Sequence, residues 1–357
     1  MSGGLPIFPA LAGLLVRGVP LSGVPPVDDY SVIVPLFNKE KTIKETLDSV
    51  FNQNRAPFEV VVIDDKSRDN SLEIVKKYAY ECGGKLTVLE NDENMGKANT
   101  LNRALSMIKT PFVLILDADT TIDPTFVQEV MRGFNGEDVQ CVSGTVLPAF
   151  KKNNALELSR AAEYLYGQRL YKMLQTKFRG MWVACGCAQL WRTQFLLKHL
   201  IPNDTVVEDM DISWIAQYKN NVNYVPNAVC RTAEPENFVS YIRQINRWFS
   251  WRLVVGKHLT RVKRGLQLSF MWLMGEAIGL IAYLAILAYF AFSGNWIPIF
   301  LMALADFCLI MLVLYEEARK FKVGSRVILL GASYFYFLRW FNMLMFWKCL
   351  FFPKKKW

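Results

Sequence analysis

A run of five apolar residues that ends in two aspartates constrains this chain more than any other feature. Phe112–Leu116 is followed by Asp117 and Asp119, one residue apart. A short apolar run between turn signals predicts a buried parallel strand, and ligands bind at the carboxyl ends of strands in open α/β sheets. Carboxylates there suit Mg²⁺ or Mn²⁺. The alternative, that these acids only precede a helix, accounts for Asp123 but not for Asp117 and Asp119.

The chain around this strand alternates short apolar runs with helical patterns. Further strands are expected at 31–35, 59–65 and 86–89, and helices at 39–54, 69–80 (with Asp69 as N-cap), 94–108 and 124–134. This alternation predicts an α/β fold with a mostly parallel sheet covered by helices on both faces. No Gly-x-Gly-x-x-Gly follows the first strand, which disfavours a dinucleotide-binding fold.

Polar residues follow two other predicted strands and open one helix. Asn38 and Glu40 follow the first strand, whereas Asp64 and Asp65 end the second. The two aspartates suit either a binding site or a turn. Lys97 opens a helix after a glycine, a position that suits either an anion contact or solvated surface.

Four sequence blocks carry a resemblance to a known family. Residues 34–40, 62–71, 94–102 and 116–119 resemble the successive blocks of family 2 glycosyltransferases with a GT-A fold, a Rossmann-like architecture. In that family the first two blocks bind the nucleobase and ribose of a UDP-sugar, and Asp-x-Asp binds a divalent metal. The resemblance implies that Asp117 and Asp119 serve Mg²⁺ or Mn²⁺. It also implies a nucleotide-sugar site that includes Pro35, Asn38, Glu40, Asp64, Asp65, Lys97 and Asp117.

Two later segments extend the resemblance to membrane-bound polysaccharide synthases. Residues 182–192 are similar to the loop that contacts the acceptor sugar, which implies acceptor roles for Trp182, Cys185 and Gly186. Glu208 and Asp209 align with the Thr-Glu-Asp motif of those enzymes, although a valine replaces the threonine. The resemblance makes Asp209 the general base, with Glu208 beside it. The alternative is a helix N-terminus that favours negative charge.

The segment 244–248 reads Gln-Ile-Asn-Arg-Trp and resembles the Gln-x-x-Arg-Trp motif of cellulose, chitin and hyaluronan synthases. Some lipid glycosyltransferases carry a related motif. Gln244, Arg247 and Trp248 are therefore expected at the donor, with Arg247 adding catalytic charge and Trp248 stacking on the acceptor sugar. The motif lies in a basic, tryptophan-rich amphipathic segment, 238–258, which would also suit a membrane interface.

A second amphipathic pattern covers 154–177 and suits either a packing helix or an interfacial one. One apolar face is expected to carry Leu158 and Ala162. Arg160 and Glu163 are expected on other faces.

Three long apolar runs, 267–292, 296–315 and 327–352, are each long enough to cross a bilayer. Basic residues flank the first two runs, which places the catalytic domain in the cytoplasm. The third run either crosses once or, interrupted at Arg339, is re-entrant. Arg339, Glu276 and Asp306 should face protein, water or each other.

The composition agrees with this division. The chain is 52% hydrophobic with a net charge of +9, and its apolar excess lies after residue 266. The charge flanks the apolar runs, which favours membrane lipids over nucleic acid as partners. Irregularly spaced cysteines and two histidines make a zinc site improbable and favour a reducing compartment. The expected regions are an N-terminal tail (1–27), a GT-A domain (28–236), an amphipathic interface helix (237–264) and a transmembrane region (265–357).

These observations predict a membrane-bound inverting glycosyltransferase that moves a sugar from a nucleotide sugar, with UDP expected, to a growing polysaccharide in a processive manner. One alternative is a single transfer to a lipid such as a ceramide or polyprenyl phosphate. Another is an inactive membrane scaffold. About three spans are few for a channel in one chain, and a homo-oligomer could supply the rest.

Overall fold

The computed structural model describes residues 29–151 and 154–354, so the predicted tail 1–27 lies outside the described residues. The strands of the described part are β1 (Tyr30–Leu36), β2 (Glu59–Asp64), β3 (Leu86–Glu90), β4 (Phe112–Leu116), β5 (Thr120–Ile122), β6 (Val139–Pro148), β7 (Ala188–Arg192) and β8 (Asn221–Thr232). Its first helices are α2 (Ile43–Phe51), α3 (Ser71–Glu81), α4 (Lys97–Leu105), α5 (Phe126–Met131), α6 (Ala155–Glu163), the π-helical turn η1 (Tyr164–Gln168), α7 (Arg169–Lys177), α8 (Thr193–His199) and α9 (Glu208–Ala216). They are followed by α10 (Phe238–Trp248), α11 (Arg252–His258), α12 (Arg264–Phe292), α13 (Trp296–Lys320), η2 (Val327–Gly331) and α14 (Ala332–Phe351).

The strands form one mixed sheet in the order β3-β2-β1-β4-β7-β6-β8-β5. The first four in this order are parallel, and β7 joins them antiparallel to β4. The parallel strands β1, β2 and β4 therefore bring their carboxyl ends to one edge, which confirms the predicted α/β architecture.

Strand β4 is buried on both faces, which explains why its sequence is apolar without alternation. Phe112, Leu114 and Leu116 pack into the core on one side of the sheet. Val113 and Ile115 pack into a second core on the other side.

One predicted helix cap is wrong. Helix α3 begins at Ser71 with Asn70 as its N-cap, not Asp69. The carboxylate of Asp69 instead accepts hydrogen bonds from the backbone N–H of Ser71 and of Glu40, and so joins the loop after β1 to the start of α3.

The predicted interface helix is two helices, α10 and α11, separated by Phe249–Trp251. Phe249 and Trp251 are buried there, and each packs against Phe346 of α14. This apolar contact accompanies the break in the helix. The segment 154–177 forms α6 and α7 with the π-helical turn η1 between them.

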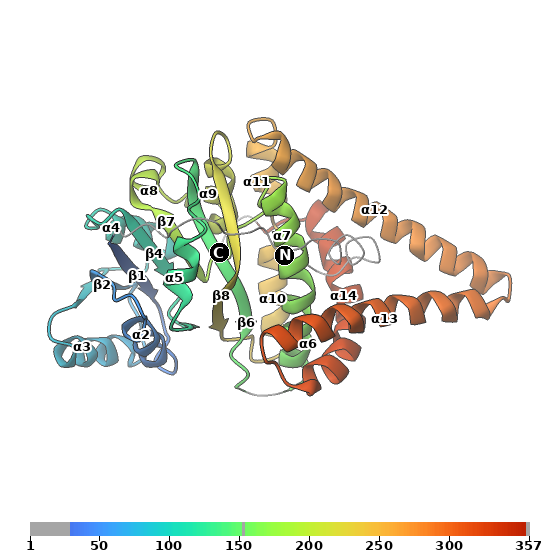
Figure 1. Ribbon diagram of the computed structural model, residues 1–357, viewed down its shortest axis with the longest axis horizontal. Coiled ribbons are helices and arrows are strands. Elements are labelled where there is room, and N and C mark those ends of the chain that lie inside the picture. Colours follow the sequence, from blue (N-terminus) through green and yellow to red (C-terminus); the bar gives the residue numbers. More distant parts are fainter. Residues whose placement is uncertain (1–28, 152–153, 355–357) are drawn as a thin grey trace.

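Three helices of the described part are long and apolar enough to cross a membrane: α12, α13 and the segment formed by η2 and α14. Helices α12 and α13 project from the α/β domain as a hairpin (Figure 1) and are little buried, 18% and 22% over their most apolar stretches. The corresponding stretch of η2–α14 is 39% buried, because it packs along α6 and α10. The third apolar helix is therefore partly covered by the α/β domain and its associated helices.

Both ends of the η2–α14 segment contact the body of the protein. Gly331, near the start of the segment, packs against α6. A Cβ added at Gly331 would lie 2.7 Å from the carbonyl oxygen of Leu158. Near its end, Arg252 donates to the Leu350 carbonyl at 2.9 Å, and the Lys354 N–H donates to Ser250 Oγ at 2.8 Å. Helix α14 continues without interruption through Arg339, which pairs with Asp306 of α13. Of the two alternatives for the third run, the interruption at Arg339 is therefore excluded.

Gly265→Ala is expected to lower the melting temperature of the detergent-solubilised protein, because an added Cβ would collide with the Phe178 carbonyl where α7 ends against α12. Overpacking of this kind costs about 1–3 kcal/mol. The control is Gly275→Ala in the same helix, where a Cβ meets nothing within 4 Å and the melting temperature should hold. Equal melting temperatures for the two variants would contradict the close contact at Gly265.

Candidate active site

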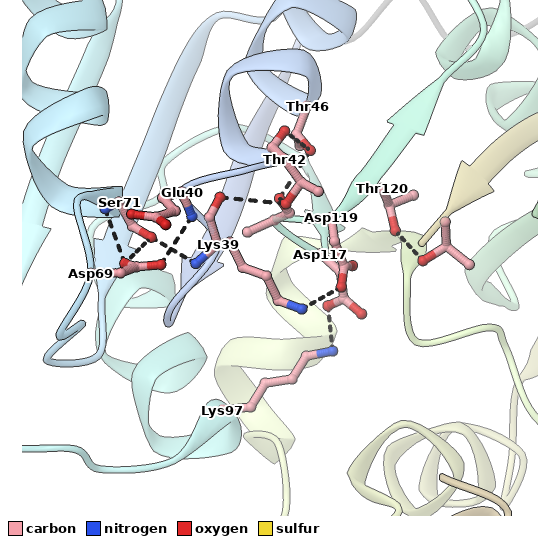
Figure 2. A network of polar contacts seen from close by, with 12 residues as sticks. Lys39, Glu40, Thr42, Thr46, Asp69, Ser71, Lys97, Asp117, Asp119 and Thr120 are labelled. Carbon is pink, nitrogen blue, oxygen red and sulfur yellow. Dashed lines mark hydrogen bonds and ion pairs between the residues drawn. The ribbon is translucent and has the colours of Figure 1, made fainter. Parts of the chain in front are cut away.

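The two aspartates after β4 each pair with a lysine from another element. Lys97 Nζ, from the start of α4, lies 2.5 Å from Asp117 Oδ1. Lys39 Nζ, from the loop after β1, lies 2.6 Å from Asp119 Oδ2 (Figure 2). The Asp117 N–H donates to the Cys187 carbonyl at 2.9 Å, which joins this turn to the predicted acceptor loop. The site thus unites four segments that are separate in the sequence.

Opposite charges are concentrated at this site. Burial raises the pKa of Asp117 and the charge of Asp119 adds to the rise, while Lys97 opposes both. Burial lowers the pKa of Lys97, but the charges of Asp117 and Glu208 outweigh it and the net pKa is raised. The pair of carboxylates therefore attracts cations.

The fit of a divalent metal follows from this donor set. Among the described residues no group of three His, Cys, Asp or Glu side chains is arranged to hold a metal. Asp117 and Asp119 are nevertheless neighbouring hard-oxygen donors whose mutual repulsion two ammonium groups already offset. Proteins often hold Mg²⁺ with one or two carboxylates, while phosphate oxygens and water supply the remaining ligands. By donor chemistry the residues present fit the predicted Mg²⁺ or Mn²⁺, which would take the places that the Lys97 and Lys39 ammonium groups hold beside Asp117 and Asp119 in this structure.

The two predicted donor residues at the end of β2 differ in the hydrogen bonds that their carboxylates make. Both oxygens of the Asp65 carboxylate accept hydrogen bonds, from the backbone N–H groups of Met95 at 2.8 Å and Gly96 at 2.9 Å. Asp64 accepts the Ser67 N–H through Oδ2, whereas its buried Oδ1 has no hydrogen-bond partner within the described residues. Asp64 is therefore the residue of the two with an oxygen left for a ligand.

The predicted donor residues near β1 help to fix the loop that follows it. Pro35 is within β1 and pairs in register with Ile63 of β2. Asn38 has a left-handed φ of 53°, and its Oδ1 accepts the Arg68 N–H. Glu40 accepts the Asn70 N–H at 3.1 Å.

The predicted acidic residues Glu208 and Asp209 lie in the first turn of α9, where the helix dipole favours negative charge. Glu208 is buried, which raises its pKa, and its Oε1 lies 3.9 Å from Lys97 Nζ. Asp209 accepts the Met210 N–H through Oδ1 at 2.8 Å, and its Oδ2 faces Gly186.

The predicted acceptor loop brings two of its three residues to the site. Cys185 and Gly186 line a cavity together with Asp209. Trp182 is 4% exposed, packs edge-on against Trp214, and is not among the residues that line that cavity. Trp182 therefore lies in the packing beneath the loop.

Gly186→Ala is expected to lower transfer by about 10²-fold, the scale of a 1 Å misplacement of a catalytic group. A Cβ at this position would lie 2.7 Å from Asp209 Oδ2 and would displace it. The measurement is turnover at saturating donor, with the melting temperature as a check on folding. Unchanged turnover in a folded variant would show that the position of Asp209 is unimportant.

Two cavities meet at this site. The larger, about 870 Å³, is lined by Asn38 and Glu40 from the loop after β1. The smaller, about 190 Å³, is lined by Lys97, Asp117, Cys185, Gly186, Glu208, Asp209 and Trp248. Their common wall consists of Asp119, Ala233, Gln244 and Arg247. Of the predicted Gln-x-x-Arg-Trp residues, Gln244 and Arg247 thus lie between the two cavities, and Trp248 lines the smaller one.

Several polar residues at the site were not predicted. Lys39 and Tyr164 contribute to it, and Glu234 lines the larger cavity. The placement of Arg160 and Glu163 away from the packed face is wrong, because both side chains are buried and ion-paired at 2.5 Å. Arg160 and Glu163 are spaced for a helical i,i+3 ion pair, but the pairing of Arg160 with Glu234 joins residues far apart in the sequence and has no local signal.

The chain is similar to known glycosyltransferases over part of its length. Residues 31–200 match the family model "Glycosyl transferase family 2". The matched segment is just under half of the 357-residue chain. It contains the Asp-x-Asp turn, the two lysines and the acceptor loop, whereas Glu208, Asp209 and the 244–248 motif lie beyond the matched range.

Curated relatives of the family 2 domain include two polysaccharide synthases. The chain is 26% identical over 226 residues to a poly-beta-1,6-N-acetyl-D-glucosamine synthase of Staphylococcus epidermidis, which covers 62% of this chain and 54% of the relative. A synthase of the same name from Staphylococcus aureus strain COL is 25% identical over 225 residues, with the same coverage. The chain thus spans about half the length of the curated relatives it matches.

A solved structure shares the fold over nearly the whole chain. It is the mannosyltransferase PcManGT from Pyrobaculum calidifontis in complex with GDP-Man and Mn²⁺. The TM-score is 0.64 at 21% identity, with 91% of each chain covered. The GT-A-like architecture predicted from the sequence is confirmed at this level.

Proposed function

We propose that this protein is a membrane-bound inverting glycosyltransferase of the polysaccharide-synthase type, which moves a sugar from a nucleotide sugar, UDP-linked, to a growing polysaccharide. The observation that carries the proposal is the common wall of the two cavities, formed by Asp119, Ala233, Gln244 and Arg247. A donor in one cavity and an acceptor in the other would meet there. The polysaccharide synthases among the relatives of the domain support this acceptor class.

The larger cavity is assigned to the nucleotide. The loop that carries Asn38 and Glu40 borders it, as expected for the first nucleotide-binding block. Arg247 and Gln244 in the common wall would face the diphosphate, and Arg247 would add positive charge there.

The smaller cavity is assigned to the acceptor. Trp248 would stack on the acceptor sugar, and Asp209 would take the proton of the attacking hydroxyl as general base. One general base is assigned and no second carboxylate is assigned as a nucleophile, so the proposed reaction is a single displacement with inversion at the anomeric carbon.

A divalent cation would be held by Asp117 and Asp119, and when bound it neutralises charge on the departing diphosphate. Lys97 and Lys39 contact these carboxylates and would remain beside the phosphates as further positive charge.

The proposal includes an arrangement of the apolar helices in the membrane. We assign α12 and α13 as the crossing hairpin, and we place η2–α14 along the cytoplasmic boundary because both of its ends contact the body of the protein. The basic residues Arg319, Lys320, Lys322 and Arg326 then lie at the cytoplasmic ends, near lipid phosphates. A homo-oligomer would be needed to enclose a channel.

A single transfer to a membrane lipid is the second candidate. One observation favours it: among the described residues, α12 and α13 are the helices that project clear of the α/β domain, and two helices do not enclose a polysaccharide channel. A lipid-linked acceptor could reach the smaller cavity from the membrane surface.

Product size separates the two candidates. The purified protein in liposomes would receive radiolabelled UDP-sugars one at a time, with Mg²⁺ or Mn²⁺. A product of high molecular weight that stays in the aqueous phase supports processive synthesis. A small product that partitions into organic solvent supports transfer to lipid and contradicts the polysaccharide proposal.

A further inference from the structure

A buried carboxylate beside the common wall has an oxygen with no hydrogen-bond partner. Glu234 follows β8 and lines the larger cavity, and its side chain is 4% exposed. Its Oε2 accepts from Arg160 Nε at 3.0 Å, and the Tyr164 hydroxyl also lies beside the carboxylate, whereas Oε1 itself has no hydrogen-bond partner among the described residues. An unsatisfied buried acceptor is costly, and native proteins contain few of them.

Glu234 is held rigidly by a cation that also supports the predicted acceptor platform. Arg160 is fully buried, and it donates to Glu163 at 2.5 Å and to the Tyr164 hydroxyl at 2.6 Å. The same guanidinium lies 4.9 Å from the centre of the Trp248 ring. The Glu234 carboxylate and the Trp248 ring are therefore positioned by one side chain.

A second acceptor without a partner lies in the same wall. Gln244 Oε1 is buried with no hydrogen-bond partner in the described part of the chain, and Gln244 lines both cavities. Both atoms need a hydrogen-bond donor, and Arg160 already supplies the positive charge that Glu234 requires. The complementary ligand is thus a neutral group rich in hydroxyls, rather than a second cation.

We propose that Glu234 is a sugar-binding residue, and that its Oε1 accepts a hydrogen bond from a hydroxyl of the donor sugar where the two cavities meet. Gln244 Oε1 accepts from a neighbouring hydroxyl of the same sugar. Glu234 then selects among donor sugars by the position of that hydroxyl, because an analogue without it leaves the carboxylate unpaired. This assignment rests on the proposed glycosyltransferase activity.

The test pairs Glu234→Ala with deoxygenated donors. Wild-type protein and variant are assayed for kcat/KM with the preferred UDP-sugar and with analogues lacking one ring hydroxyl each. A hydrogen bond to a charged group corresponds to about 10- to 100-fold. The wild-type protein should lose that factor with one particular analogue. Glu234→Ala should show the same loss of kcat/KM with the parent donor. Its kcat/KM should not fall further when the parent donor is replaced by that analogue.

The controls separate binding from folding. Glu234→Gln keeps an acceptor oxygen of the same shape and should recover part of the discrimination. Glu81→Ala, on the exposed end of α3, should behave like the wild type throughout. The assignment would be overturned if every variant showed the same ratio of kcat/KM between parent and deoxygenated donors as the wild type. Glu234 would then be a support for Arg160 or a partner of a bound water. Absence of turnover by the wild type with every donor would overturn the proposed function, and this assignment with it.

Discussion

Asp209→Asn is expected to abolish sugar transfer, with a loss on the order of 10²- to 10⁴-fold, while donor binding stays close to that of the wild type. The reason is that Asp209 lies in the smaller cavity and is the residue assigned to take the acceptor proton, whereas the nucleotide is assigned to the other cavity. Transfer would be followed by product formation from a radiolabelled UDP-sugar. Binding would be followed by titration with UDP.

Asp204→Asn is the matched control, because Asp204 is exposed and pairs with Lys257 near the same helix. It should leave turnover unchanged. Retained turnover in Asp209→Asn would remove Asp209 from the role of base and direct attention to Glu208 beside it.

Removal of divalent metal is expected to reduce transfer on the order of 10³-fold, with full recovery when Mg²⁺ or Mn²⁺ is restored. The physical reason is that the charge on the departing diphosphate needs neutralisation worth several kcal/mol. Asp117 and Asp119 are the neighbouring carboxylates at the end of β4 that would hold the ion. The measurement is initial rate in chelator and after titration with each metal.

Asp119→Asn should raise the metal concentration needed for half-maximal rate, because the substitution removes one of the two negative charges. Asp123→Asn serves as its control, since Asp123 lies in the same segment but pairs with Arg231. A rate that does not change in chelator would contradict the assignment of a metal to these carboxylates.

Much of the α/β domain was predictable because its signals are local. The Phe112–Leu116 run is apolar throughout because both faces of β4 are buried, and the two aspartates follow it at the sheet edge. The start of α9 at Glu208 also follows from local charge preference at a helix N-terminus.

The support of the site was not predictable, because it depends on distant partners. Arg160 was expected away from the apolar face, yet it is buried, and two of its partners, Glu234 and the ring of Trp248, lie more than seventy residues along the chain. Trp182 was expected at the acceptor, yet it packs against Trp214 and Trp251. Periodicity shows which residues share a face, and it does not show what that face meets.

The membrane segments show the same limit. Length and hydropathy give three similar candidates, and only packing distinguishes them. Gly331 and Leu350 of the η2–α14 segment contact α6 and α11, respectively, whereas the α12–α13 hairpin projects (Figure 1).

Release of UDP coupled to sugar transfer tests the central claim most directly. Purified protein in liposomes would be supplied with a series of UDP-sugars and Mn²⁺, and both free UDP and labelled product would be measured. The account predicts that at least one donor gives product and UDP in equal amounts, and that Asp209→Asn gives neither above background. A folded wild-type protein that releases no UDP and transfers no sugar from any donor would contradict the account and indicate a membrane scaffold that retains the fold.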